Sequence, residues 1–209
     1  MPATSLSTTR RSLHGVAELL LAGPQHRATG EIALRVTADG FATSFEPDLR
    51  FDGRAVAAGG RRIEVAGLSY ADIAAELGVV AREPVDLYGD GSGVRPAETV
   101  VLDSAAVAAI IGAFAAGDEA LRRFAPDEEP ILWPEHFDVG ITIGEVNYGL
   151  APGDGAVPEP YAYVGPHRPR SGEFWNVPFG AARTVRELGD ASGILAFYDV
   201  GRRLIASGS

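Results

Sequence analysis

Three tight-turn signals separate short alternating runs between residues 31 and 65. Apolar side chains alternate with small or polar ones from 31 to 37 and again from 41 to 45, which is the period of a half-buried strand. The turn pairs are Asp39-Gly40, Asp52-Gly53 and Gly59-Gly60. Because such pairs supply the positive φ angles of tight hairpins, the pattern predicts an antiparallel meander of about four strands.

Helices are expected on both sides of this meander. Apolar residues between positions 13 and 21 share one helical face, which predicts an amphipathic helix capped near Ser12 and ended by Gly23-Pro24. A short helix is predicted from Ser69 to a stop at Gly78, and the longest one follows a cap at Asp103 or Ser104. Residues 1–125 therefore form a meander module with packed helices.

From residue 126 the pattern changes in kind. Strands are predicted at 137–143, 145–150, 161–164 and 174–176, and a C-terminal helix from about 191. Tyr161 and Tyr163 are expected on one face of their strand. The fold class is therefore α+β: an antiparallel meander with packed helices, followed in 126–209 by a second antiparallel β-rich module with a C-terminal helix. The acidic stretch Ala125–Pro130 connects them, and one compact domain is the alternative.

Two residue types are missing, and their absence excludes several chemistries. The chain has no Cys and no Lys, so all 18 of its cationic side chains are Arg. It therefore has no thiolate nucleophile, no Cys-ligated metal and no lysine Schiff base. The formal net charge of −10 disfavours nucleic acid and anionic membranes as partners. An Arg pair at Arg10-Arg11 superficially resembles an export signal, but Glu18 interrupts the apolar stretch after it, so a cytoplasmic location is expected.

The segment 131–180 has the composition of a ligand pocket. It holds 8 of the 17 aromatic residues, both Trp and both Asn. Aromatic rings build rigid walls and Asn, His and Glu add directional hydrogen bonds, a combination typical of small-molecule sites, although such residues also build the cores of small β-rich modules. The expected ligand-binding residues are Trp133, Glu135, Asn147, Tyr148, Glu159, Tyr161, Tyr163, Trp175 and Asn176.

His136 and Asp138 are the candidate catalytic residues. If a strand begins near Glu135, its alternation sends Phe137 to the core and places His136 and Asp138 together on the opposite face. A carboxylate beside an imidazole can orient it and raise its basicity, so His136 would act as general base and Asp138 would orient it. The simpler alternative is that His136 caps the strand while Asp138 is solvated.

Two other functions stay open at this point. One is a metal-dependent enzyme resembling non-haem iron enzymes, with His136 and Asp138 as ligands and either His167 or Glu159 completing the set. The other is a non-catalytic protein whose aromatic surface meets a second copy of the chain or another partner. The sequence identifies no cofactor. Gly89–Gly93 is interpreted as a flexible hairpin tip, and His14 and His26 as surface or helix-end histidines.

Five motifs in the second half carry a family resemblance. They are LWPEHFD (132–138), NYG (147–149), PGD (152–154), PEPY (158–161) and FWN (174–176). Together they resemble an uncharacterised high-GC bacterial family, a domain of unknown function, and the likeness extends over most of the chain. The resemblance implies that the 131–180 cluster is one unit. It implies no activity.

Overall fold

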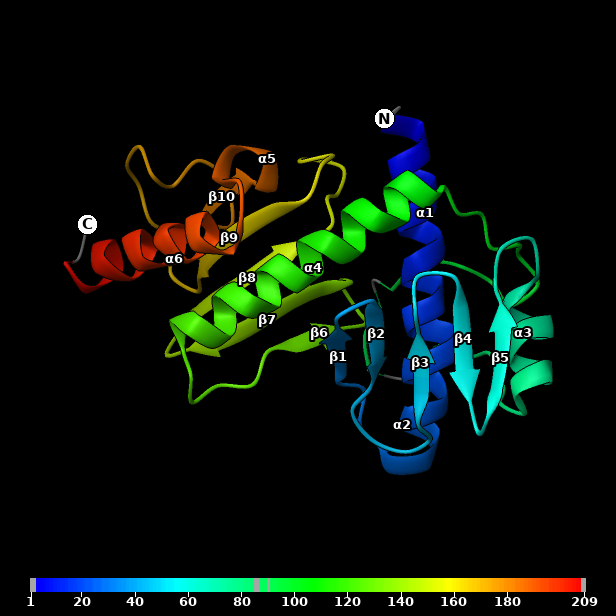
Figure 1. Cartoon of the computed structure of the whole chain (residues 1–209). Coiled ribbons are helices and arrows are strands. Elements are labelled where there is room, and N and C mark those ends of the chain that lie inside the picture. Colours follow the sequence, from blue (N-terminus) through cyan, green and yellow to red (C-terminus); the bar gives the residue numbers. More distant parts are fainter. Residues whose placement is uncertain (1–2, 85–86, 90, 208–209) are drawn as a thin grey trace. The chain divides into compact units, whose positions relative to one another are not determined.

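A computed structural model describes residues 3–84, 87–89 and 91–207 of the chain (Figure 1). It has an α+β fold with antiparallel strands. The chain divides into two compact units, Met1–Ile111 with Leu132–Phe137, and Gly112–Ile131 with Asp138–Ser209. These units differ from the predicted modules 1–125 and 126–209, because the longest helix, α4 (Ser104–Phe124), contributes to both.

The first unit contains an antiparallel sheet in the order β6-β1-β2-β3-β4-β5. Its strands are β1 (Leu34–Thr37), β2 (Gly40–Thr43), β3 (Leu49–Phe51), β4 (Ala55–Ala58), β5 (Arg61–Glu64) and β6 (Ile131–Trp133). The predicted meander is confirmed, with one strand more than expected. Gly59 and Gly60 both have positive φ between β4 and β5, as predicted.

The first hairpin uses its glycine differently from the prediction. The turn residues are Ala38 and Asp39, and Gly40 is already the first residue of β2, paired with Thr37. Gly40 has no positive φ. A side chain at Gly40 would instead overlap the carbonyl oxygen of Phe51 on β3. The glycine is therefore needed for a close approach of two strands.

One long helical rod packs on this sheet, formed by α1 (Ala3–Gly15), η1 (Val16–Ala22) and α2 (Gly23–Thr29) (Figure 1). The prediction that the helix ends at Gly23-Pro24 is wrong. The middle segment η1 is a π-helix in which the Gly23 amide donates to the Glu18 carbonyl. The next amide in that pattern would belong to Pro24, which has none, and the carbonyl of Leu19 accepts instead from the Arg82 amide at 3.2 Å.

The remaining helical caps of the first unit agree with the sequence. α3 (Tyr70–Leu77) begins at Ser69, whose hydroxyl accepts from the Asp72 amide, and ends at Gly78 in the left-handed region. Asp103 caps α4 by accepting from the Ala106 amide at 2.9 Å. Ser12 does not cap a helix; it lies inside α1, where its hydroxyl accepts from the Val101 amide.

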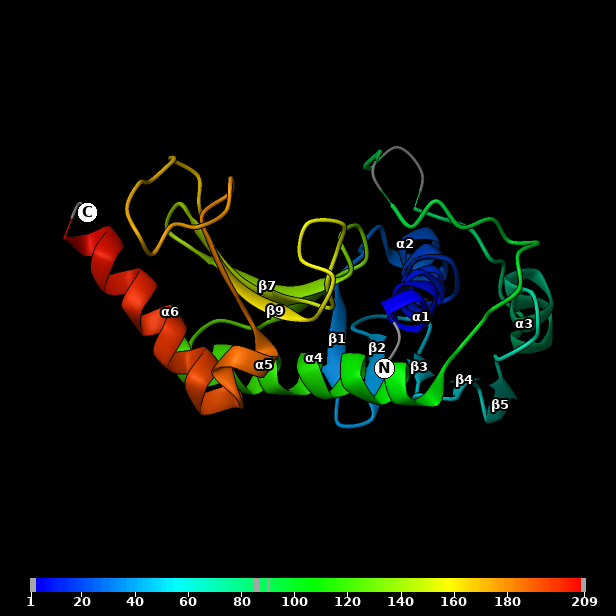
Figure 2. The same cartoon turned by 90° about the horizontal axis from the view of Figure 1, so that it is seen from above.

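The second unit contains an antiparallel sheet in the order β10-β9-β8-β7. Its elements are β7 (Asp138–Ile143), β8 (Val146–Ala151), β9 (Tyr161–Pro166), β10 (Ala181–Thr184), α5 (Val185–Leu188) and α6 (Ala191–Ala206). Figure 2 shows α4 along one face of the β7–β9 strands. The predicted strand at 174–176 is wrong, because these residues form a turn and irregular backbone and the strand starts at Ala181.

Small residues let the helices of this unit approach the sheet. Gly117 of α4 lies against Leu150, and Gly201 of α6 lies against Val164. The core on this side includes Phe124, Tyr148 and Tyr198, and the Tyr148 ring centroid lies 4.6 Å from that of Phe124. This face of the sheet is therefore filled by the helices.

The described residues include one helix, α4, that is long and apolar enough by length and composition to cross a bilayer. Core helices of soluble proteins meet the same criterion, and 44% of the most apolar stretch of α4 is buried.

Candidate functional site

Residues 134–137 form a turn, so the expected strand from Glu135 is wrong. The Phe137 amide donates to the Trp133 carbonyl, and Phe137 has a φ of +53°. This left-handed backbone breaks the alternation on which the shared face of His136 and Asp138 depended, and β7 begins only at Asp138. Phe137 itself is 1% exposed, as predicted for a core residue.

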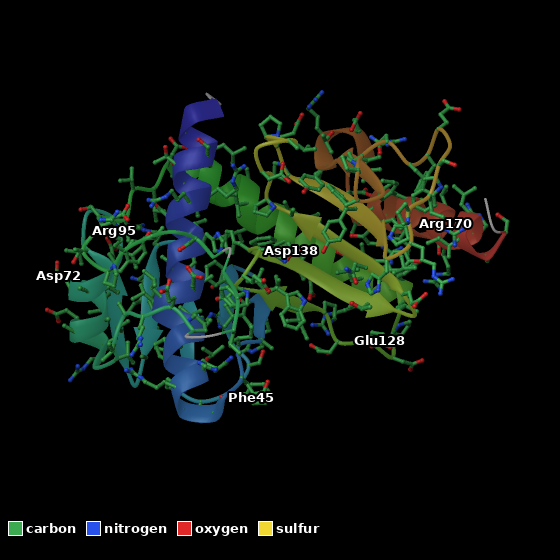
Figure 3. The ribbon with its side chains drawn as sticks, turned by 180° about the vertical axis from the view of Figure 1, so that it is seen from behind. Phe45, Asp72, Arg95, Glu128, Asp138 and Arg170 are labelled. Atoms are coloured by element: carbon green, nitrogen blue, oxygen red, sulfur yellow. The ribbon has the colours of Figure 1, made fainter. Side chains whose placement is uncertain are left out.

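The two candidate catalytic residues therefore lie in different surroundings. The His136 side chain is 64% exposed, and its Nε2 lies 4.0 Å from Oε1 of Glu135. Asp138, labelled in Figure 3, is 7% exposed. Its Oδ2 accepts a hydrogen bond from the Tyr163 hydroxyl. The structure thus joins Asp138 to a tyrosine that was predicted as a pocket wall.

Two glycines leave room for the Tyr163 side chain to reach Asp138. Gly140, Gly149 and Tyr163 occupy consecutive paired positions on β7, β8 and β9. A Cβ at Gly149 would overlap the Tyr163 ring and one at Gly140 would lie 3.1 Å from its hydroxyl, so the side chain of Tyr163 crosses β8 and β7 where neither has a side chain. Burial raises the pKa of Tyr163 well above its ordinary value, and the charge of Asp138 adds to the rise. The phenol is therefore a permanent hydrogen-bond donor at neutral pH.

A second phenol–carboxylate pair lies two positions away on the same face of β9. The Tyr161 hydroxyl donates to Oδ2 of Asp154 at 2.6 Å, and Oδ1 of Asp154 accepts from the amides of Ala156 and Val157, both at 2.7 Å. Tyr161 and Tyr163 have ring centroids 6.4 Å apart. The predicted common face of these two tyrosines is confirmed, and Ala162 and Val164 on the other face are fully buried.

An open hollow of about 320 Å³ lies beside β10. It is lined by Val157, Asn176, Val177, Ala182, Arg183, Thr184 and Glu187. Three of these residues, Val157, Val177 and Ala182, pack with Tyr161 and Tyr163. The hollow therefore borders the face that carries the two tyrosine–carboxylate pairs.

Asn176 and Trp175 lie beside this hollow in largely structural roles. The amide of Asn176 donates to the Ala182 carbonyl at 3.2 Å and its Oδ1 accepts from the Ala182 amide at 2.9 Å, which fixes the loop to β10. Trp175 is half-buried and meets the Phe174 ring edge to face, with centroids 4.9 Å apart.

The other predicted ligand-binding residues are not gathered around the hollow. Asn147 accepts from Thr142 at 2.9 Å and lies 3.3 Å from Nε2 of the exposed His167, while Tyr148 points into the core. Glu159 forms an exposed two-bond pair with Arg186, at 2.8 and 3.0 Å. Trp133 and Glu135 belong to the first unit, where Trp133 is 38% exposed.

The buried polar side chains around η1 in the first unit were not predicted from the sequence. Glu18 is 1% exposed, and its Oε2 accepts from the Ser92 amide and hydroxyl. His14 was expected at the surface or at a helix end. It lies in the last turn of α1, but it is largely buried, with Nε2 2.7 Å from the Pro134 carbonyl and its ring stacked on Phe137. The only signal in the sequence was a single carboxylate inside the apolar run VAELLLA.

No three His, Asp or Glu side chains within residues 3–84, 87–89 and 91–207 are grouped so that they could hold a metal ion. Comparison with known proteins found no matching family model, no matching curated protein and no matching solved structure. The resemblance of the five motifs to an uncharacterised bacterial family therefore stays a prediction.

Proposed function

We propose that this protein binds a small polar or aromatic molecule in the second unit, in the hollow beside Tyr161. The observation that carries the proposal is the hollow itself. Its volume of about 320 Å³ lies at the lower end of the range of small-molecule sites, which begins at roughly 300 Å³. The proposal keeps the predicted segment 131–180 as part of the site and extends it to β10 and α5.

The chemistry of the lining supports a ligand with both apolar and polar parts. Val157, Val177 and Ala182 supply apolar surface, and Arg183, Thr184 and Glu187 supply charged and hydrogen-bonding groups. Such mixed linings bury an apolar body while a few polar groups fix its orientation.

The surroundings of the hollow are held in place before any ligand arrives. Asp154 binds the amide of Val157 and the hydroxyl of Tyr161, and Asn176 binds Ala182 through both of its amide atoms. Binding to a preformed site costs less ordering entropy than binding to a mobile one. The arrangement supports binding rather than a defined reaction, because His136 is exposed and Asp138 is engaged by Tyr163.

Tryptophan fluorescence offers a direct test, since the chain has only two Trp residues. In the Trp133→Phe variant, Trp175 is the sole tryptophan, and it directly precedes Asn176 of the lining in the chain. We expect at least one compound in a panel of benzoate, benzylamine, nicotinamide and simple sugars to change this emission saturably. The Trp175→Phe variant, which retains only Trp133 of the first unit, should not respond.

A variant that fills the hollow tests whether the change in Trp175 fluorescence arises from binding there. Val177→Phe adds bulk to the lining and should weaken binding at least tenfold, whereas Val80→Phe, at a position 52% exposed in the first unit, should leave it unchanged. The proposal is wrong if no compound saturates the Trp175 signal up to millimolar concentration, or if Val177→Phe binds as well as the parent.

A further inference from the structure

The hollow beside β10 has one residue of each charge in its lining. Arg183 is the cation of this lining and Glu187 is its anion. The remaining polar residues, Asn176 and Thr184, are neutral, so the lining has no net formal charge. A charge taken from water into a site is costly unless an opposite charge meets it. A ligand that matches this lining therefore carries both a positive and a negative group.

Arg183 has a pair of donors available for a carboxylate. Its Nη1 donates to the Ala182 carbonyl at 2.8 Å, while Nε and Nη2 form no hydrogen bond or ion pair with any described residue. The same two nitrogens of Arg186 bind the two carboxylate oxygens of Glu159, at 3.0 and 2.8 Å. This side of a guanidinium fits a carboxylate through two parallel hydrogen bonds. Arg183 thus offers a ligand the fork that Arg186 uses within the chain.

Glu187 has one oxygen available for an ammonium group. Its Oε2 accepts from the amide and the hydroxyl of Thr184, at 2.8 and 2.7 Å, in the capping box of α5. Its Oε1 accepts no hydrogen bond from the described part of the chain. The hydrogen bonds from Thr184 lower the pKa of Glu187, and the positive charges of Arg183 and Arg186 lower it further. The carboxylate is therefore ionised at neutral pH and lies near enough to Arg183 to interact with it.

The rest of the lining offers a hydrocarbon surface. Three of its residues are apolar, namely Val157, Val177 and Ala182. They pack with Tyr161 and Tyr163, which hold them in place from behind. An apolar group of a ligand gains free energy by covering this surface. The volume of about 320 Å³ is small for a ligand site, so the charged groups and the apolar group must belong to one compact molecule.

We propose that the hollow binds a free α-amino acid with an apolar side chain. Arg183 binds the α-carboxylate through Nε and Nη2, and Glu187 binds the α-ammonium through Oε1. The side chain of the ligand packs on Val157 and Val177. This inference rests on the ligand-binding function proposed for the hollow and specifies the class of its ligand.

Leucine and two analogues that each lack one charge test the pairing without any change in the lining. 4-Methylpentanoate lacks the ammonium group, and 3-methylbutylamine lacks the carboxylate. In the Trp133→Phe protein at pH 7, leucine should change the Trp175 emission saturably. It should bind about fivefold or more tightly than either analogue, because hydrogen bonds to charged groups contribute more than neutral ones. Val177→Phe should weaken leucine binding as well, since the bulk occupies the same hollow.

Two substitutions in this background assign each charge of leucine to its partner. Arg183→Gln should weaken leucine about fivefold or more without weakening 3-methylbutylamine. Glu187→Gln should weaken leucine by a similar factor without weakening 4-methylpentanoate, and α5 keeps its cap because Gln also serves in capping boxes. Arg186→Gln is the matched control: Arg186 pairs with Glu159 outside the lining, so this variant should bind leucine like the parent.

The outcomes separate this inference from the proposed function. If benzoate, benzylamine, nicotinamide or a sugar saturates the Trp175 signal while leucine binds no more tightly than its analogues, the hollow binds a ligand but the ligand is not an amino acid. If neither that panel nor leucine binds, the proposed function and this inference are both wrong. The inference is also overturned if Arg183→Gln weakens leucine and 3-methylbutylamine equally, because Arg183 would then shape the hollow rather than bind a carboxylate.

Discussion

Among the described residues, each unit buries one carboxylate, and the two are held in opposite ways. Asp138 in the second unit receives its hydrogen bond from Tyr163, a residue on a strand of the same sheet. Glu18 in the first unit receives its hydrogen bonds from Ser92, which is far away in the sequence and lies outside the helices and strands. One carboxylate is therefore held by strand register and the other by a loop.

This difference indicates how easily the backbone around each carboxylate opens locally. The register of β7, β8 and β9 is fixed by backbone pairing along the strands, which holds the backbone of Tyr163 opposite Gly149. A loop segment such as Gly91–Val94 has no such ladder, and local opening there costs less than opening a sheet.

The largest expected effect compares the glycines beside the two carboxylates. A Cβ at Gly149 would lie 2.6 Å from the Val139 carbonyl oxygen and would overlap the rigid Tyr163 ring, so Gly149→Ala should destabilise the protein by about 3 kcal/mol. The nearest neighbours of a Cβ at Gly91 are the end of the Glu18 side chain and the Tyr88 ring edge, so Gly91→Ala should cost less, about 1 kcal/mol.

Urea denaturation measures both values. Gly155→Ala is the control, since its Cβ would have no neighbour within 4 Å and its φ is not positive. If Gly91→Ala were as destabilising as Gly149→Ala, the loop around Glu18 would be as rigid as the sheet. That result would contradict the inferred difference between the two carboxylates.

The next largest effect on stability distinguishes Tyr163 from Tyr161, which both lie on β9. Tyr163→Phe removes the hydroxyl that donates to a carboxylate only 7% exposed, and should destabilise by about 2 kcal/mol. Tyr161→Phe leaves Asp154 with the amides of Ala156 and Val157, and should cost about 1 kcal/mol or less. Equilibrium unfolding in urea at pH 7 measures the two losses, and a larger loss for Tyr161→Phe would show that Asp138 does not depend on its tyrosine.

A pH effect of intermediate size is expected from His14. Burial lowers its pKa in the folded protein, so the unfolded state binds the proton more readily. The stability that the neutral imidazole allows is present above the unfolded value of about 6.5 and is lost as the pH falls below it toward the folded value. Urea midpoints between pH 5 and 8 should therefore fall on the acid side.

His14→Gln should remove this part of the pH dependence while retaining a donor for the Pro134 carbonyl. His136→Gln is the matched control, because that side chain is 64% exposed, and its urea midpoints should follow those of wild type. Identical pH profiles for all three proteins would contradict the burial of His14.

Local patterns predicted local features of this chain well. The Ser69 cap, the Gly78 stop and the common face of Tyr161 and Tyr163 follow from side-chain chemistry and strand period alone, and the structure has all of them. These features need no information from distant parts of the sequence.

Features set by distant contacts could not be predicted in this way. Pro24 is normally a helix stop, but the helix continues because the Leu19 carbonyl finds the Arg82 amide. Phe137 adopts a positive φ because its ring packs on His14 and Phe41, which holds a backbone that an aromatic residue seldom adopts. The prediction that His136 and Asp138 share one face depended on an extended backbone at Phe137. Because Phe137 has a positive φ, the two side chains lie in different surroundings.

The smallest expected effect concerns Glu159, which the sequence offered as a ligand or metal contact. The structure pairs it with Arg186 at the surface, where solvent and salt screen the attraction, and the Arg186 guanidinium lowers the pKa of Glu159. Glu159→Gln should therefore leave the urea midpoint at pH 7 unchanged within error, in low salt and in high salt. It should equally leave the Trp175 response unchanged, because Glu159 does not line the hollow. A loss of that response would extend the proposed site across the Glu159–Arg186 pair, whereas a loss of stability alone would show that an exposed pair can matter as much as a buried one.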